Sequence, residues 1–205
     1  MNNMDWSNLP FGYHKTDYNV RCYYRNGAWG ELEISSSDHL EIHMASTALH
    51  YGQEVFEGLK AYRGKHGDIR LFRWEENYKR MTRSARGILM EPVPKKIFRE
   101  AIFQTIRMNE KWIPPYGTGG TLYIRPLLLG LGPEIGVSPA KEYLFVLFVS
   151  PVGPYFKEGF SPIKIAIVRN TDRSAPLGTG MYKVGGNYAA SLFGINESKK
   201  QGYTQ

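Results

Sequence analysis

Two apolar runs, at residues 121–129 and 143–149, constrain the fold of this chain more than any other feature. Both runs are rich in leucine, aromatic and β-branched side chains, which is typical of central strands that are covered on both faces. The second run is the longest apolar stretch in the chain, and it is far too short to cross a bilayer. The sequence therefore predicts a core built around a sheet, in a chain without a membrane partner.

Turn signals and helical spacing predict further elements around these strands. An Asn-Gly pair at 26–27 and a glycine-containing loop at 64–68 each separate two strand-like runs, which predicts two hairpins. Apolar residues recur at helical spacing in two later segments. The expected elements are strands at 19–24, 28–34, 59–63 and 69–72, helices at 74–88 and 95–109, and one or two helical turns at 51–57.

The character of the chain changes at residues 151–162, where Pro and Gly predict a linker between domains. After the linker we expect a strand at 163–168, a loop, and a helix that Asn187 caps and that ends before Gly202. Three elements are too few to bury a core of their own. The predicted fold class is α+β, with an N-terminal α/β domain at 1–150 that has a mainly antiparallel sheet and two packed helices, a linker at 151–162, and the truncated start of a second domain at 163–205.

Composition and charge exclude several classes of function. With 42% hydrophobic and 22% charged residues, the chain is expected to fold rather than stay disordered. Its single cysteine, Cys22, rules out an internal disulfide and favours a reducing compartment, so we expect a cytoplasmic protein. The first residues show the pattern of neither a signal peptide nor a transit peptide. The net charge of +7 is scattered among acidic residues, so no nucleic-acid partner is expected.

Histidines and basic residues give two further expectations. The five histidines show no ligand spacing, such as i and i+4 on one helix, so no metal site is expected. Basic residues form one local cluster, Lys79, Arg80, Arg83 and Arg86, which on a helix covers more than one face. A solvated helix surface explains such a cluster. The alternative is that one inward-facing member holds a phosphate group.

A lysine stands in a glycine-bounded loop, GTGMYKVGG at residues 178–186, directly before an expected helix. Glycines on both sides let the backbone take positive φ and approach a ligand closely. A lysine held in such a loop can be desolvated and can attack a carbonyl as a nucleophile. The loop lacks the Gly-Lys-Ser/Thr ending of a Walker A motif. Lys183 is therefore a candidate catalytic residue, and the alternative is that it is one of many solvated charges.

Short motifs follow one another along nearly the whole chain, from Leu9 to Gln205. They are HYGQEVFEGLKAY at 50–62, LFR at 71–73, RMTRSA at 80–85, LYIRP at 122–126, GVS at 136–138, PVGPYF at 151–156 and KVGGNY at 183–188. In order and spacing, these motifs resemble the branched-chain amino-acid aminotransferases, which are fold type IV enzymes that use pyridoxal 5'-phosphate. The resemblance implies that residues 163–205 are the start of a barrel-like, cofactor-binding large domain.

The resemblance implies three residues that hold the cofactor. The Schiff-base lysine of the family corresponds to Lys183, whose freed amine would move a proton between the substrate Cα and the cofactor C4′. The phosphate-binding arginine corresponds to Arg80, whose planar fork can hold two phosphate oxygens, while Arg83 and Arg86 remain surface charges. Tyr188 corresponds to the tyrosine that bonds the phenolic oxygen of the cofactor.

The resemblance also implies a substrate pocket, which must accept both a leucine-like and a glutamate-like substrate. Its aromatic wall for a branched aliphatic side chain consists of Phe11, Phe56, Tyr123 and Tyr155, with Tyr188. Tyr51 and Arg125 match polar positions that accept the distal carboxylate of glutamate. Ile135 and Val137 match a loop that a partner subunit contributes, which implies a homodimer. Without the motifs, the aromatic residues would be interpreted as ordinary core.

The implied function is transamination of leucine, isoleucine or valine with 2-oxoglutarate. Family members continue into segments that supply an acidic partner for the pyridine nitrogen, further phosphate contacts and a loop for the substrate carboxylate. We therefore expect this chain to be the N-terminal part of a longer enzyme, with residues 163–205 loosely held or packed against another chain. The alternatives are a non-catalytic N-terminal fragment, or a related fold type IV enzyme acting on D-amino acids or aminodeoxychorismate. The YIRP and FEGLK motifs favour the branched-chain group.

Overall fold

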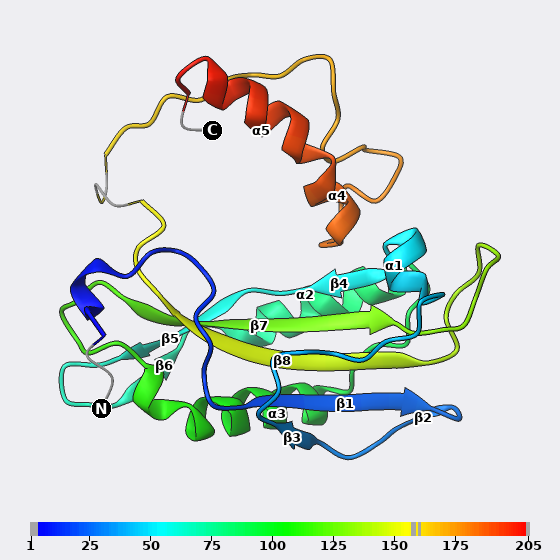
Figure 1. The fold of residues 1–205 in the computed structure, drawn as a ribbon, viewed down its shortest axis with the longest axis horizontal. Coiled ribbons are helices and arrows are strands. Elements are labelled where there is room, and N and C mark those ends of the chain that lie inside the picture. The colour runs from blue at the N-terminus through cyan, green and yellow to red at the C-terminus, as the bar shows by residue number, and fades with distance from the viewer. Residues whose placement is uncertain (1–3, 157–158, 160, 204–205) are drawn as a thin grey trace.

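One antiparallel sheet organises the protein (Figure 1). The computed structural model describes residues 4–156, 159 and 161–203. Its strands are β1 (Asn19–Arg25), β2 (Ala28–Trp29), β3 (Glu33–Ser35), β4 (Glu54–Phe56), β5 (Leu59–Arg63), β6 (Ile69–Leu71), β7 (Thr121–Gly130) and β8 (Tyr143–Val152). Their order is β2-β1-β8-β7-β5-β6, with β3 paired to β1 and β4 paired to β7. The α-helices are α1 (Thr47–Tyr51), α2 (Trp74–Gly87), α3 (Lys95–Met108), α4 (Gly185–Ala189) and α5 (Ser191–Lys200).

The two apolar runs form the centre of the sheet, as predicted. Strands β7 and β8 pair along their whole length, from Thr121 opposite Val152 to Gly130 opposite Tyr143. Strand β8 continues three residues past the expected end at 149 and enters the range predicted as a linker. The long pairing gives the sheet a rigid middle onto which the shorter strands are added.

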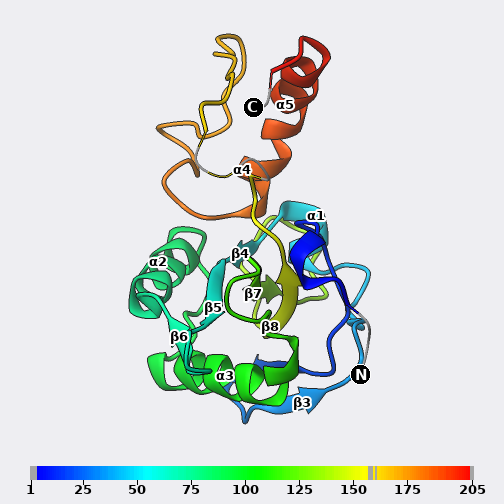
Figure 2. The same ribbon diagram turned by 90° about the vertical axis from the view of Figure 1, so that its left-hand side faces the viewer.

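Helices α2 and α3 lie on one side of the sheet (Figure 2). The apolar positions whose spacing predicts α3 are buried, and the Phe98 ring stacks on Phe145 of β8 with 5.9 Å between ring centroids. In α2, the buried apolar positions are Met81 and Ala85. Burial of a phenylalanine such as Phe98 stabilises the fold by about 1.5–3 kcal/mol. The predicted α+β class, with a mainly antiparallel sheet and two packed helices, is confirmed.

The helical turn expected at 51–57 is wrong. Helix α1 ends at Tyr51, Gly52 takes a left-handed conformation with φ of 60°, and the chain then enters β4. Val55 is fully buried and pairs with Leu128 of β7. Tertiary pairing with β7 therefore overrides the local helical signal. Because side chains alternate along a strand, Val55 points to the opposite face of the sheet from Glu54 and Phe56.

Two further expectations of regular structure are wrong. The expected strand at 163–168 forms no strand with any described segment, and Ile165 and Ile167 are 61% and 77% exposed. A strand needs a neighbour to satisfy its N–H and C=O groups, and apolar alternation alone does not supply one. The predicted second arm of the first hairpin is also interrupted, because residues 30–32 belong to neither β2 nor β3 and the pairing with β1 shifts by one residue between these two strands.

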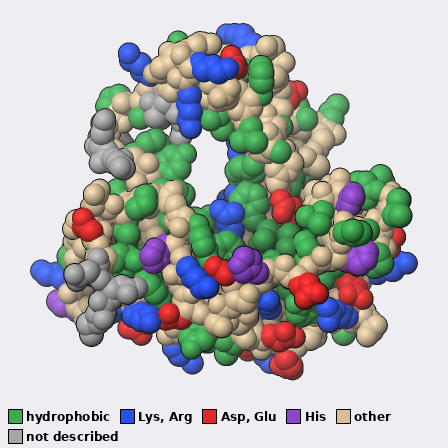
Figure 3. All heavy atoms as spheres, in the orientation of Figure 1, with side chains coloured by type: hydrophobic (Ala, Val, Ile, Leu, Met, Phe, Trp, Pro, Cys, Tyr) green, Lys and Arg blue, Asp and Glu red, His purple; other side chains and the backbone are tan. Residues whose placement is uncertain are grey.

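The C-terminal segment, residues 161–203, arches over the sheet and returns to it just before α4 (Figure 1). Val184 forms a bridge with Val55 of β4, and the N–H of Phe56 donates to the carbonyl of Lys183. A space-filling view shows an opening through the molecule between this segment and the sheet (Figure 3). None of the helices in the described ranges combines the length and the apolarity that a bilayer span needs. The return contact places Lys183 on the sheet.

Candidate active site

Lys183 is anchored through its backbone to two elements of the sheet domain. Its N–H donates to the hydroxyl of Ser84 on α2 at 2.9 Å, and its carbonyl accepts from the N–H of Phe56 on β4. The ring of Tyr182 lies against Gly87, where a Cβ would overlap it. The end of α2 therefore needs a glycine so that the lysine loop can dock closely.

Asn187 fastens the loop from the other side. Its side-chain amide donates to the carbonyls of Thr179 and Tyr182 at 2.8 and 2.9 Å, and its Oδ1 accepts from the hydroxyl of Thr179. Asn187 lies inside α4 and is buried, so the predicted helix cap is wrong. The side-chain amide of the asparagine is used to bind two carbonyls of the loop, so it does not cap the helix.

The Lys183 amine lies against two aromatic rings that also contact each other. Its Nζ donates to the Tyr188 hydroxyl at 2.6 Å, and it lies 4.1 Å from the Phe56 ring centroid and 4.7 Å from that of Tyr188. The Phe56 and Tyr188 rings are themselves 4.8 Å apart. These contacts hold the amine in one place at the junction of β4 and α4.

Burial raises the pKa of the Tyr188 phenol, but the hydrogen bond from Lys183 and the charges of Lys183 and Arg173 outweigh it, so the net pKa is lowered. A lowered pKa means that the phenolate form is favoured more than in a free tyrosine. The Lys183 amine and the Tyr188 hydroxyl therefore place a proton donor and a proton acceptor next to each other in the site.

Arg80 pairs with a buried carboxylate that the sequence did not reveal as part of the site. Its Nε and Nη2 donate to the two oxygens of Glu57 at 2.6 and 2.7 Å. The Glu57 side chain has no solvent exposure, and Asn77 donates to it as well. Among the described contacts, Nη1 of Arg80 has no acceptor, so its N–H groups are available to a further anion.

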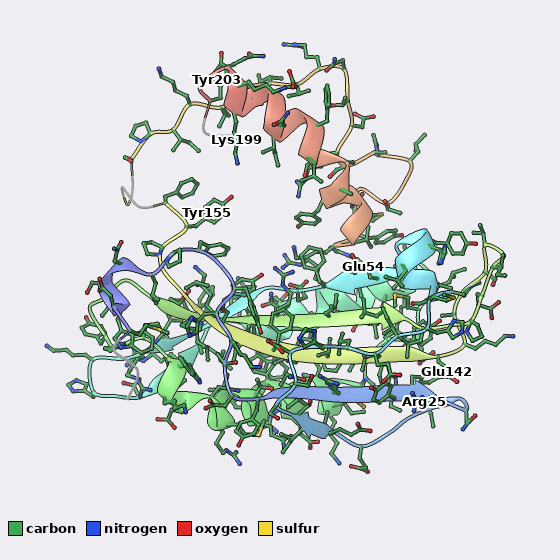
Figure 4. All side chains as sticks on the ribbon, viewed as in Figure 1. Arg25, Glu54, Glu142, Tyr155, Lys199 and Tyr203 are labelled. Carbon is green, nitrogen blue, oxygen red and sulfur yellow. The ribbon has the colours of Figure 1, made fainter. Side chains whose placement is uncertain are left out.

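The predicted aromatic wall forms a continuous row of contacts that starts at Lys183. The Arg125 guanidinium lies 4.7 Å from the Phe56 ring centroid, and its Nη2 donates to the Tyr123 hydroxyl at 3.0 Å. Phe11 then packs edge-on against Tyr123 and Tyr155, at 5.8 and 5.1 Å between ring centroids. The side-chain view places Tyr155 on the segment that leaves the sheet, beside the opening (Figure 4). The residues brought together are Lys183, Tyr188, Phe56, Arg125, Tyr123, Phe11 and Tyr155.

The N-terminal segment reaches this row because Gly153 has no side chain. The N–H of Gly153 donates to the carbonyl of Pro10 at 3.2 Å, and a Cβ at this position would overlap the carbonyl of Leu9. The N–H of His14 also donates to the hydroxyl of Ser150 at 2.8 Å. These contacts fix Phe11 over the site although 112 positions separate it from Tyr123 in the sequence.

Three of the predicted site residues lie elsewhere. The hydroxyl of Tyr51 donates to the carbonyl of Ile135, and this pair lies at the other end of β7, beyond α1. Ile135 and Val137 are 87% and 88% exposed. Among the described contacts, none joins these three residues to the row that contains Lys183.

Two acidic residues and one arginine belong to the site without having been predicted. They are Glu57, Glu54 on β4, and Arg173, whose guanidinium lies 4.7 Å from the Tyr188 ring centroid. Glu54 lies at the junction of β4 and α4 (Figure 4), where a Cβ on Gly185 would overlap its carboxylate. Glu57 could have been suspected because it stands in the FEG motif. Nothing in the sequence around Arg173 indicates that this residue reaches the site.

Comparison with known proteins supplies relatives for this geometry. The model of the amino-transferase class IV family matches residues 54–205. The chain is 49% identical over 202 residues to the branched-chain-amino-acid aminotransferase of Haemophilus influenzae, and 46% identical over 204 residues to that of Helicobacter pylori. The two alignments cover 98% and 99% of this chain but 59% and 60% of the relatives, so the chain spans about three fifths of their length.

Solved structures share the fold. The branched-chain amino acid aminotransferase from Escherichia coli has a TM-score of 0.62 and 28% identity, over 92% of this chain and 56% of that one. The T.th. enzyme complexed with N-(5'-phosphopyridoxyl)-L-glutamate has a TM-score of 0.63 and 29% identity, over 92% of this chain and 57% of that one. Because the family model matches most of the chain, including the Lys183 loop, this protein belongs to the class IV aminotransferases.

Proposed function

We propose that this chain is the N-terminal part of a pyridoxal-phosphate enzyme that transaminates leucine, isoleucine and valine with 2-oxoglutarate. The observation that supports the proposal most is the Lys183 amine, which is held 2.6 Å from the Tyr188 hydroxyl and against the rings of Phe56 and Tyr188. The names of the relatives support this reaction, and their greater length supports a longer enzyme.

The residues present fit pyridoxal 5'-phosphate. Lys183 would hold its aldehyde carbon, Tyr188 its phenolic oxygen, and the unpaired edge of Arg80 its phosphate. The pairing of Arg80 with buried Glu57 supports this assignment, because it fixes the position of the guanidinium and leaves one of its nitrogens, Nη1, for the phosphate. When bound, the cofactor supplies an electron-withdrawing ring that stabilises negative charge at the substrate Cα.

The side chains around this position would orient the substrate and move its proton. Lys183 Nζ, once free, would take the proton from the substrate Cα as a general base and would deliver it to the cofactor C4′ as a general acid. The Tyr188 hydroxyl, which accepts a hydrogen bond from this amine, would keep Nζ on the reacting side. The Phe56 ring would exclude water from the same side of the amine.

The row of aromatic residues supports a branched aliphatic substrate, and Arg125 supports a dicarboxylate. Apolar rings of Phe11, Phe56 and Tyr123 offer contact area to a leucine-like side chain. The Arg125 guanidinium lies beside Phe56 and Tyr123, where its positive charge could pair with a carboxylate in the second half-reaction. One T.th. structure is complexed with 4-methylvaleric acid and another with N-(5'-phosphopyridoxyl)-L-glutamate, which agrees with both uses.

A homodimer and a cytoplasmic location are also part of the proposal. The exposure of Ile135 and Val137, at 87% and 88%, supports their predicted contact with the pocket of a partner subunit. The buried free cysteine, Cys22, supports a reducing compartment. The division into domains at 1–150 and 163–205 with a linker at 151–162 likewise remains a proposal.

The test is to trap the cofactor on the lysine. The chain is incubated with pyridoxal 5'-phosphate, reduced with borohydride and digested, and the labelled peptide is mapped. We expect label on Lys183, and Lys183→Ala should lower the trapped amount about tenfold or more. Lys199→Ala, which removes an exposed lysine of α5, is the matched control and should change nothing.

If no lysine is labelled, the result would favour the non-catalytic fragment and would contradict the proposal for this chain. Substrate class is then tested with the longer enzyme from the same gene. A higher rate with L-leucine than with D-alanine supports the branched-chain assignment, and the reverse order would favour a D-amino-acid enzyme.

A further inference from the structure

Tyr188 contacts a second cation, which is not among the predicted site residues. The guanidinium carbon of Arg173 lies 4.7 Å from the Tyr188 ring centroid, which is the same distance as that of Lys183 Nζ. A guanidinium at this distance from an aromatic face is attracted by the ring quadrupole. The tyrosine is therefore held by one cation at its hydroxyl and by another at its ring.

The loop geometry that places Arg173 is specific. The N–H groups of Gly178 and Gly180 both donate to the carbonyl of Ala175, at 3.1 and 3.2 Å. A Cβ on Gly180 would lie 2.5 Å from the carbonyl carbon of Ser174, so the close packing of this turn requires glycine. The turn follows Arg173 directly, and Asn187 ties its far end to α4. Arg173 stands at the start of this loop and Tyr188 follows its end, so the closed loop brings the two residues together.

Charged groups reach Tyr188 from two directions. Arg173 and Lys183 come from the loop, and Arg80 comes from α2. Arg80 is paired with Glu57, which neutralises most of its charge at this position. Arg173 has no carboxylate partner among the described ion pairs, so none of those carboxylates neutralises its charge beside the Tyr188 ring.

We infer that Arg173 is a positioning residue, whose guanidinium holds the Tyr188 ring so that the hydroxyl stays on the Lys183 amine. The catalytic meaning of this contact rests on the proposed function, because Tyr188 matters for catalysis only if Lys183 carries the cofactor. The contact itself is present in the cofactor-free chain, and it can be measured there. The charge of Arg173 also contributes to the lowered pKa of Tyr188, after the opposing effect of burial.

The test follows the titration of Tyr188 in the full cofactor-free chain. Tyrosine labelled with carbon-13 at Cζ reports the phenol, and Tyr188→Phe assigns its signal. Arg173→Gln should raise the pKa of Tyr188, because it removes a cation that favours the phenolate. Arg173→Lys should restore most of the shift. Arg169→Gln is the matched control, since it removes one positive charge from an exposed position of the same loop.

A second readout is the amount of pyridoxal 5'-phosphate that borohydride traps on Lys183 at neutral pH. Arg173→Gln should lower this amount about twofold to fivefold, which corresponds to the loss of one exposed cation–π contact. An unchanged titration of Tyr188 in Arg173→Gln, or an equal shift in Arg169→Gln, would overturn the inference. If Lys183 is never labelled but the Tyr188 titration depends on Arg173, the proposed function fails and the positioning contact stands.

Discussion

At the scale of single residues, the Glu57 carboxylate is a buried charge that depends on its hydrogen-bond partners. It has no solvent exposure, and it accepts from Arg80 through two bonds and from Asn77 through one. Glu57→Gln should lower the free energy of unfolding by about 2–3 kcal/mol, because it removes the charge that pairs with the guanidinium. Urea unfolding at neutral pH measures this loss. Glu110→Gln, which weakens a half-exposed pair with Arg63, should cost less than about 1 kcal/mol, and equal losses would contradict the prediction.

Glu54 gives a prediction of the opposite sign. Burial raises its pKa above the ordinary value of 4.5, although the charge of Arg125 opposes the change. The folded chain therefore binds this proton more tightly than the unfolded chain does, and stability falls as the pH rises from about 4.5 through the folded pKa.

Glu54→Gln should accordingly stabilise the fold at pH 7, by less than about 1 kcal/mol because the group is only half buried. The gain should vanish near pH 4, where the native carboxyl is protonated in both states. Urea unfolding at the two pH values provides the comparison. A variant that is less stable than the parent at pH 7, or a gain that is equal at both values, would show that the carboxylate is stabilising where it lies.

At the scale of elements, Asn187 joins the lysine loop to α4. Asn187→Ala removes three hydrogen bonds and leaves the carbonyls of Thr179 and Tyr182 without these donors. We expect amide hydrogen exchange across residues 179–184 to become about tenfold faster, since the lost part-buried bonds together are worth about 1–2 kcal/mol. Asn196→Ala, at an exposed position of α5, serves as the control. Exchange that is unchanged in Asn187→Ala would mean that other contacts hold the loop.

The elements that the sequence predicts well are those whose local pattern matches their tertiary environment. The spacing of Phe98, Ile102 and Ile106 predicts α3 because the same face meets the sheet. Strand β4 is different, because Val55 becomes a strand residue through pairing with Leu128, which is 73 positions away. The candidate site follows the same rule. Lys183 stands out through its flanking glycines, whereas the contact between Arg173 and Tyr188 depends on how one loop closes.

At the scale of the whole molecule, the C-terminal segment presents apolar side chains that the sheet domain does not cover. The exposed members are Ile163, Ile165, Ile167, Val168, Leu177, Leu192, Phe193 and Ile195. Its described contacts with the sheet domain centre on Tyr182, Lys183, Val184 and Tyr188. Many large apolar side chains exposed on one short segment favour a covering partner. The prediction that residues 163–205 are loosely held or pack against another chain therefore stays a prediction, and these side chains are where it can be tested.

Two adjacent side chains of α5 allow that prediction to be tested. Leu192 and Phe193 are 66% and 59% exposed, so changing both to glutamine should leave the sheet domain intact. If the chain self-associates through this surface, their burial contributes about 2–3 kcal/mol, and the double variant should associate roughly thirtyfold to a hundredfold more weakly. Sedimentation over a range of concentrations measures the association. Leu89→Gln alters a similarly exposed leucine, 69% exposed, on the sheet domain and should have no effect. Association that persists undiminished in the double variant would place the interface elsewhere, and the exposed loop of Ile135 and Val137 would then be the next surface to change.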